Sequence, residues 1–226
     1  MKVQYLGHSG FFIEADGKNI VIDPFLTGNP LATGGPADIA ADYVLVSHAH
    51  SDHLGDAVGI ARETGATVIS TFEIATWCQG QGISAHPLHI GGSFDFDFGS
   101  VKLTIAHHGS TLIGEDGSFL TLGNPCGFII KTSGKTLYHA GDTGLFYDMK
   151  LIGEMNDIDV AMLPIGGNFT MGIDDAVKAV EFLSPDIAIP MHFDTFDVIK
   201  ADPNDFAAKV MKNGGAVTIL GPGPSI

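Results

Sequence analysis

The chain has 226 residues, a formal net charge of −15 and a hydrophobic content of 45%. This length and this amount of apolar material fit one large domain over residues 1–226 better than two small ones. The negative charge argues against a nucleic-acid partner, which needs a cationic surface along the phosphates. No stretch approaches the length of a membrane span, and the start of the chain lacks the apolar run of a secretion signal. We therefore expect a soluble, cytoplasmic protein with neither a nucleic-acid nor a membrane partner.

Cys78 and Cys126 are the only cysteines. They follow neither the spacing of a metal-binding motif nor that of a disulfide framework. Both are expected to be ordinary buried residues of a protein from a reducing compartment.

The first segment predicts three strands joined by tight connections, over residues 3–6, 11–15 and 19–22. Asp16-Gly17 is typical of a hairpin turn between the last two. His8 lies in the first break, and Asp23 ends the third strand. A polar residue at a strand end can steady the ligands of a nearby metal, so both are candidates for that supporting role. Their alternatives are a core histidine and an ordinary turn before proline, and the sequence leaves both interpretations open.

Residues 27–41 form a stretch rich in Gly, Pro and Ala, without periodicity. A loop of this length in a compact domain is often a lid or a binding loop. It can equally run over the surface, and the sequence does not distinguish the two.

Three histidines and an aspartate follow an apolar strand predicted over residues 43–46, namely His48, His50, Asp52 and His53. Side chains two apart on an extended segment share a face, so His48 and His50 can converge on one ion. Asp52 and His53 come after the strand, where a turn can direct them to a second ion. Nitrogen and carboxylate ligands favour zinc and are compatible with manganese, iron or nickel.

The next segment predicts a helix over residues 56–64, a strand over 66–70 and a helix over 73–79. This order favours a right-handed crossover between locally parallel strands. His86 and His89 follow in a turn-rich connection without a second type of ligand, so we interpret both as surface or hydrogen-bonded histidines.

Two further strands lead to the next histidines. Residues 94–98 alternate aromatic and acidic side chains, which predicts a half-buried strand with its aspartates on the outer face. Residues 101–106 predict a strand that ends at His107 and His108. Adjacent residues of a strand face opposite sides, so only one of the two is expected to reach a metal. Spacing alone does not choose between them.

The following hairpin places a carboxylate at a strand end. Its strands cover residues 126–132 and 135–139, and Asp142 follows in a Gly-Asp-Thr-Gly sequence. A carboxylate has two oxygens and can bridge two ions held about 3.5–4 Å apart. The same four residues are also typical of a turn with a helix N-cap, and taken alone they favour the turn.

The last part of the chain predicts helices over residues 174–183 and 204–212 and strands over 159–164, 186–191 and 216–220. Asp174 is expected to cap the first of these helices. The second strand delivers His192 at its end. Asn168, Thr170 and Thr195 lie on loops beside predicted ligands, where they could donate hydrogen bonds to a substrate, although such residues are also common in plain turns.

The motifs in combination resemble the metallo-β-lactamase superfamily: HAHSDH at residues 48–53, a strand-end His108, GDT around Asp142 and a strand-end His192. LGHSGFFIE, IDPF, LPIGGNFTMG and MHFDTF narrow the resemblance to an uncharacterised cytoplasmic family of metal-dependent hydrolases, which is related to the ascorbate-phosphate lactonases. The resemblance runs nearly end to end. It implies an α/β (α+β) fold, a four-layer αββα sandwich with the site at one edge, and it is compatible with a homo-oligomer.

The resemblance also implies a set of metal ligands: His48, His50 and His108 for a first metal, Asp52, His53 and His192 for a second, and Asp142 as the bridge. It favours His108 over His107 because the family pattern places its histidine directly before two small residues, here Gly109 and Ser110. The HxHxDH pattern departs from the HxExD form of the flavodiiron oxidoreductases, which argues against redox iron chemistry.

A site with two divalent metal ions indicates that the protein catalyses hydrolysis. Two divalent ions lower the pKa of a bridging water, so that hydroxide is available near pH 7. Asp52 could also accept the proton of that water and return it to the leaving group, and with Asp142 it is the expected catalytic pair. A small-molecule lactone or related ester is the first expectation for the substrate, on the kinship with the lactonases. A phosphodiesterase acting on a small phosphoester is the alternative, and a non-catalytic metal-binding scaffold subunit is the alternative of a different class.

Overall fold

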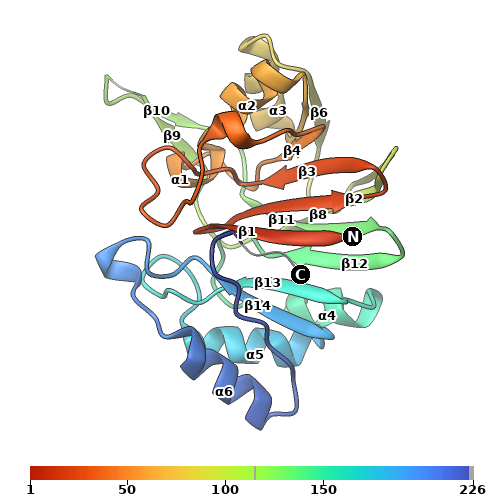
Figure 1. Ribbon diagram of the computed structural model, residues 1–226, viewed down its shortest axis with the longest axis vertical. Helices are drawn as coiled ribbons and strands as arrows, with labels where there is room; N and C mark the ends of the chain where they lie inside the picture. Colours follow the sequence, from red (N-terminus) through yellow and green to blue (C-terminus); the bar gives the residue numbers. More distant parts are fainter. Residues whose placement is uncertain (115, 224–226) are drawn as a thin grey trace.

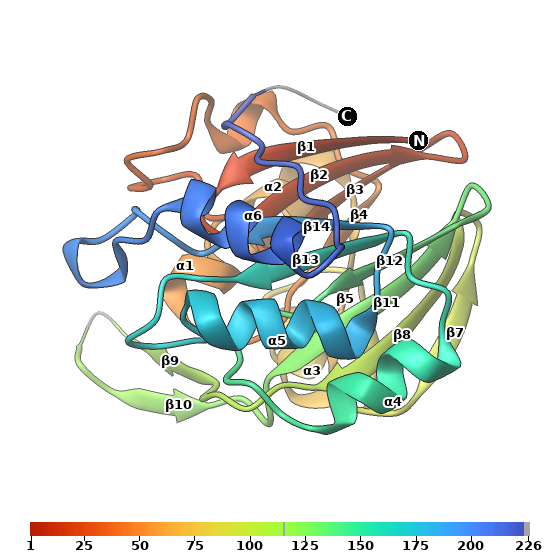
Figure 2. The same ribbon diagram turned by 90° about the horizontal axis from the view of Figure 1, so that it is seen from below.

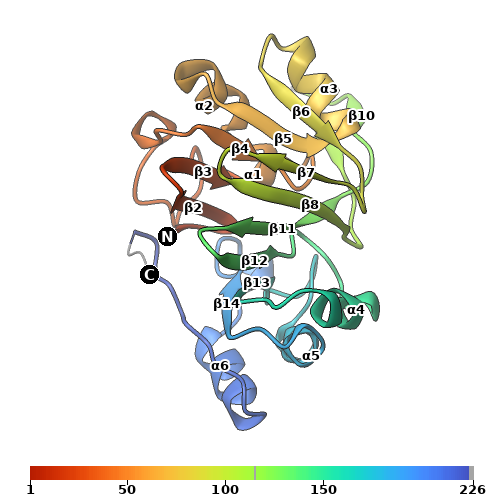
Figure 3. The same ribbon diagram turned by 90° about the vertical axis from the view of Figure 1, so that its right-hand side faces the viewer.

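The structure of the protein is a computed structural model that describes residues 1–114 and 116–223. Two six-stranded sheets pack face to face, and helices cover the outer face of each (Figures 1 and 3). The predicted four-layer αββα sandwich is confirmed.

The N-terminal sheet follows the order of the chain, with β1 (Lys2–Gly7), β2 (Gly10–Ala15), β3 (Lys18–Ile22), β4 (Tyr43–Leu45), β5 (Thr67–Thr71) and β6 (Ala85–Leu88). The first three strands are antiparallel neighbours, and β3 to β6 run parallel. A parallel β4–β5 pair is what the strand–helix–strand pattern predicts.

The C-terminal sheet has the order β14 (Ile187–Met191), β13 (Val160–Pro164), β12 (Lys135–His139), β11 (Cys126–Thr132), β8 (Gly99–Ile105) and β7 (Ser93–Phe96). β12, β13 and β14 are parallel, and the remaining pairs are antiparallel. A separate hairpin of β9 (Thr111–Ile113) and β10 (Phe119–Thr121) projects from the sandwich. Because β8 and β12 each pair antiparallel with β11, the carboxyl ends of β8, β12 and β14 lie at one edge.

The N-terminal sheet is covered by α2 (Ala57–Thr64) and α3 (Phe72–Gly80), with the short α1 (Ser51–Leu54) at the edge. The C-terminal sheet is covered by α4 (Asp148–Met155), α5 (Ile173–Leu183) and α6 (Pro203–Lys212), which lie in front of it in Figure 2. Two single 3₁₀ turns occur at Pro36–Asp38 and Asp197–Ile199.

The core divides between two layers because side chains alternate along each strand. Leu45 of β4 faces the space between the sheets, where it joins the same cluster as Phe128 of β11. Its neighbour Val44 faces outward and packs with Ile60 of α2 and Ile74 of α3. Both faces of the parallel strands are therefore apolar, as buried parallel sheets require. Cys78 and Cys126 are buried and unpaired, as predicted.

Every predicted strand and helix but one is confirmed within two residues of its ends. The exception is the strand over residues 216–220, which is wrong because only Val217 forms a bridge, to Ala188 of β14. The chain then turns away and reaches β1, where the amide of Gly223 donates to the carbonyl of Tyr5. His86 lies in β6 rather than in a turn, and its ring contacts that of Phe94 at a tilt, with centroids 4.2 Å apart.

The predicted cap of α5 is also wrong. Gly172 occupies the N-cap position, and Asp174 lies in the first turn. The carboxylate of Asp174 instead accepts a hydrogen bond from Lys209 of α6 at 2.9 Å. The side chain therefore joins two helices and does not cap one.

No helix in the described part of the chain is both long and apolar enough to cross a bilayer.

Candidate metal centre

Both sheets contribute to one cluster of imidazoles and carboxylates. β4 leads to His48 and His50, α1 carries Asp52 and His53, and the ends of β8, β12 and β14 lead to His108, Asp142 and His192. Each side chain thus follows a strand end, at the sheet edge where such sites are built. All seven predicted ligands meet in space.

His48, His50 and His108 form the first group of donor atoms. These atoms lie within 4.8 Å of one another. Nε2 of His48 is 3.0 Å from Nδ1 of His50, and the ring of His108 lies about 5 Å from both rings. Two nitrogens bound tetrahedrally to one zinc ion at 2.0–2.1 Å are roughly 3.3 Å apart. The arrangement therefore fits a shared divalent ion.

Asp52, His53 and His192 form the second group, and the structure adds His8 to it, again with donor atoms within 4.8 Å. Nε2 of His53 is buried, without a hydrogen-bond partner among the described residues. A buried nitrogen without a partner is costly, and a metal ion relieves that cost for a nitrogen directed at it. This group, too, fits a divalent ion.

Asp142 lies between the two groups. Its Oδ2 is 3.0 Å from Nε2 of His192, 3.3 Å from Nε2 of His53 and 3.5 Å from Nε2 of His108. Its Oδ1 is buried and has no hydrogen-bond partner within the described chain. Burial opposes ionisation, but His192 and His53 outweigh it and hold the pKa of Asp142 well below its usual range. An ionised carboxylate between the two groups of imidazoles is suited to contact an ion bound by either group.

Asp23 determines which nitrogens of two histidines face this centre. Its Oδ2 accepts hydrogen bonds from Nδ1 of His53 at 2.8 Å and from the hydroxyl of Ser47 at 2.6 Å. The Ser47 hydroxyl has given its only proton to Asp23, so it accepts from Nδ1 of His48 at 2.9 Å. Nε2 of both rings is then left with a free lone pair, as a ligand needs. Asp23 makes the contacts that its predicted supporting role requires.

His8 holds Asp52. Its Nε2 lies 3.1 Å from Oδ2 of Asp52, and its Nδ1 lies 2.9 Å from the hydroxyl of Thr195. Burial lowers the pKa of His8 to about 4, so the ring is neutral near pH 7. A neutral ring that donates to the carboxylate through Nε2 must accept from Thr195 through Nδ1.

Thr195 therefore has a different partner from the one that the sequence suggested. Its hydroxyl is buried on His8 and is not free for a substrate. Asn168 and Thr170 lie on the loop after β13, which passes close behind His192: a β-carbon on Gly166 would overlap the carbonyl oxygen of His192. Among the described contacts, the side chain of Thr170 bonds only the carbonyl of Met171, and Asn168 is exposed.

His107 points away from the cluster. It is exposed, and its ring contacts Phe146 with centroids 5.0 Å apart. The structure thus brings His108 and not His107 to the predicted ligands.

Sequence reasoning missed Ser47 and His139. Nε2 of the buried His139 donates to the carbonyl of Ser9 at 3.0 Å, and its Nδ1 accepts from the amide of Gly141 at 3.1 Å. It therefore joins the turn that carries His8 to the turn that carries Asp142. Its place at a strand end is the same signal that pointed to Asp23.

The backbone is strained at three positions of the cluster. His8, Asp23 and His192 have φ angles of 59°, 43° and 54°, in the left-handed region that side chains rarely adopt. Such strain persists where surrounding contacts over-determine a conformation, which is common at functional sites.

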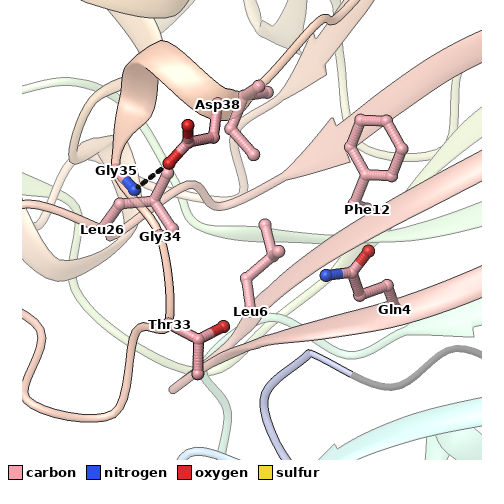
Figure 4. A pocket seen from close by; sticks show the side chains of 9 residues that line it. Gln4, Leu6, Phe12, Leu26, Thr33, Gly34, Gly35 and Asp38 are labelled. Carbon is pink, nitrogen blue, oxygen red and sulfur yellow. Dashed lines mark hydrogen bonds between the residues drawn. The ribbon is translucent and has the colours of Figure 1, made fainter.

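A cavity of about 280 Å³ lies elsewhere, on the outer face of β1 and β2 (Figure 4). Gln4, Leu6 and Phe12 line it from the strands, and residues 33–39 cover it from the 27–41 loop. None of the predicted ligands lines this cavity, so this part of the loop covers the sheet and not the cluster.

Comparisons with known proteins identify the family of the chain. A family model described as "Beta-lactamase superfamily domain" matches residues 2–192. A UPF0173 metal-dependent hydrolase of Carboxydothermus hydrogenoformans is 52% identical, with 100% of this chain and 99% of the relative covered. One of Pelotomaculum thermopropionicum is 54% identical with the same coverage. The solved structure of Igni18, a metallo hydrolase from Ignicoccus hospitalis, is 42% identical, covers 100% of this chain and 97% of that one, and has a TM-score of 0.90.

The fold and the histidine–aspartate cluster are those of a metallo-β-lactamase-type hydrolase. Within that class, the chain belongs to the UPF0173 family of metal-dependent hydrolases.

Proposed function

We propose that this metal-dependent hydrolase uses two divalent ions to cleave a small-molecule lactone or related ester. The observation that carries the two-ion proposal is the position of Asp142, whose Oδ2 lies within 3.5 Å of nitrogens from both groups. The first ion would be held by His48, His50 and His108, the second by Asp52, His53 and His192, and Asp142 would contact both.

Zinc is the first choice of metal, since the donors are imidazole nitrogens and carboxylate oxygens; manganese, nickel and iron share these preferences. Such ions supply Lewis acidity and an activated water when bound. The described donors match this chemistry, because the buried nitrogens of the cluster are held in fixed tautomers by groups behind them.

Asp52 and Asp142 have different environments and therefore different proposed roles. Asp142 is buried among histidines, which suits a ligand that stays ionised. The side chain of Asp52 is 25% exposed, and one of its oxygens is held by His8. Although burial opposes it, the hydrogen bond from His8 keeps the pKa of Asp52 below its usual value, so the carboxylate is ionised near pH 7. We assign proton transfer to Asp52.

The charges of the site favour an uncharged ester over a phosphoester. The largest charge effects on Asp52 come from His53, His8 and Asp142, those on Asp142 come from His192 and His53, and no Lys or Arg is among them. A phosphate group is usually bound by Arg or Lys side chains in addition to a metal ion. Phosphodiester hydrolysis is therefore the second proposal for the reaction. We further propose that the enzyme is cytoplasmic and has neither nucleic-acid nor membrane partners.

The test is hydrolysis by the zinc-reconstituted protein of a panel of lactones, a carboxylic ester, a phosphodiester and a β-lactam. We expect two zinc ions per chain and turnover of a lactone or ester that chelator abolishes and zinc restores. Asp142→Ala should lose zinc and turnover together, by about 100-fold or more, since removing a ligand costs at least as much as removing a supporting residue. Asp157→Ala, an exposed aspartate away from the cluster, is the matched control. Two bound zinc ions without turnover of any substrate would favour the scaffold alternative, and full zinc binding by folded Asp142→Ala would refute the bridge.

A further inference from the structure

Two phenylalanines stand beside the second group of donors. Phe25 follows β3 and Phe196 follows β14, so they come from different sheets, yet their ring centroids are 6.4 Å apart. Both rings meet the ring of His8 edge-on, at 5.7 Å and 5.5 Å. His8 in turn bonds Asp52. The aromatic pair therefore lies one side chain away from the proposed proton acceptor.

Both rings keep apolar surface open to solvent. Phe196 is 38% exposed and Phe25 is half-buried, whereas the His8 ring that they cover is completely buried. Shielding His8 from solvent requires only the edges of the two rings that face it, so the exposed ring surface is not needed for that purpose. Exposed aromatic surface directly beside a polar reaction centre is typical of a ligand site, where few polar groups are combined with apolar walls.

The two rings are held in place from behind. Thr195, the residue before Phe196, bonds His8 at 2.9 Å, and the carbonyl of Phe196 accepts from the amide of Ile199 at 3.1 Å. The amide of Phe25 donates to the carbonyl of Asp23, and its carbonyl accepts from the side chain of Asn29. A backbone fixed in this way loses little freedom when the side chains on it bind a ligand, which favours affinity.

Charge near the pair does not favour an anionic group. Lys200 is the one basic residue between residues 193 and 201, and its ammonium group already pairs with Asp197 at 2.7 Å. An uncharged alkyl or aryl substituent is therefore the chemistry that this surface fits.

We propose that Phe25 and Phe196 form an apolar subsite that binds an alkyl or aryl substituent of the substrate while the ester group lies over the metal centre. This proposal rests on the proposed hydrolase function and narrows the substrate to an uncharged lactone or ester with an apolar chain.

The first experiment compares γ-nonalactone, which carries a pentyl chain, with the unsubstituted γ-butyrolactone. We expect the wild type to have at least a tenfold lower KM for the long lactone, since even a single methylene in an apolar pocket changes discrimination by about tenfold or more. Phe25→Ala and Phe196→Ala should each reduce that ratio to below about threefold. Phe94→Ala removes a ring of similar exposure (47%) on β7, away from the cluster, and should keep the wild-type ratio.

The second experiment measures binding without turnover, as the affinity of octanoate relative to acetate for the zinc-loaded protein by calorimetry. Octanoate should bind at least ten times more tightly, and both subsite variants should remove that advantage. Hydrolysis of both lactones with equal KM would overturn the subsite and leave the hydrolase function standing. Absence of hydrolysis would count against the hydrolase function alone, and the octanoate-to-acetate affinity ratio would then decide the subsite. Equal binding of octanoate and acetate would refute the subsite. So would a loss of the octanoate preference in Phe94→Ala equal to the loss in the two subsite variants.

Discussion

Asp23 contacts the candidate metal centre from behind without belonging to either group of donor atoms. One buried carboxylate accepts from His53 directly and from His48 through the hydroxyl of Ser47. An amide in its place would present an N–H group to at least one of these donors. The tautomers of both histidines therefore depend on the charge and acceptor character of residue 23.

We expect Asp23→Asn to weaken zinc binding by about 10–100-fold, the usual cost of losing the group behind a histidine ligand. Zinc titration against a competing chelator measures the change. Asp16→Asn, at an exposed aspartate in the turn between β2 and β3, is the matched control. Unchanged affinity in Asp23→Asn would show that the tautomers are set by other groups.

The adjacent histidines at the end of β8 should behave differently. His108→Ala should lower the amount of bound zinc and the rate of hydrolysis, because Nε2 of His108 lies 3.5 Å from Asp142. His107→Ala should leave zinc binding unchanged, because that ring lies on Phe146 at the surface. Zinc content per folded chain, measured for both variants, decides the assignment, and the reverse pattern would exchange the two roles.

At the scale of elements, local pattern predicted most of the fold, and its failures have physical causes. β4 and β11 read as strands because nearly all their side chains are buried. α4 was not predicted: Leu151 and Met155 are exposed on it and Gly153 interrupts it, which obscures its helical period. The β9–β10 hairpin was not predicted either, since Ile113 and Phe119 are both exposed and no buried face imposes alternation.

In the candidate site, too, some residues could be predicted from local sequence and others could not. The cluster from His48 to His53 is local and was visible as a motif, and the remaining ligands were assigned by resemblance. The contact of His8 with Thr195 joins residues 187 positions apart. Such a contact depends on how two sheets pack, and nothing in the local pattern of either segment specifies it.

The N-cap of α6 offers a test of one element in isolation. The side chain of Asp202 accepts from the amide of Asn204 at 2.8 Å, at the start of Pro203–Lys212. Asp202→Ala should lower the free energy of unfolding by about 1 kcal/mol, the usual cost of losing a cap. Denaturant unfolding measures it, and zinc content should stay at the wild-type value because α6 carries no ligand. A loss of zinc would mean that α6 and the site are coupled.

For the whole molecule, metal binding should stabilise the packing of the two sheets, because both provide donors. A ligand that binds only the folded state at 100 times its dissociation constant adds about 2.7 kcal/mol to the free energy of unfolding. We therefore expect chelator to lower the melting temperature and zinc to restore it. The increment should shrink as pH falls, since protons compete for the imidazole nitrogens. A melting temperature that does not respond to zinc would show that the metal does not join the sheets.

Because the predicted ligands are divided between the two sheets, they are synthesised at different times on the ribosome. The N-terminal half of the sandwich ends at Leu88 and carries only His48, His50, Asp52 and His53 among the seven predicted ligands. His108 and Asp142 follow, and His192 comes after β14, the last strand. A chain growing on the ribosome thus exposes a histidine-rich half-site long before its counterpart exists. The complete set of donors first becomes available when β14 pairs with β13, so loading of the metal can report that the sandwich has closed.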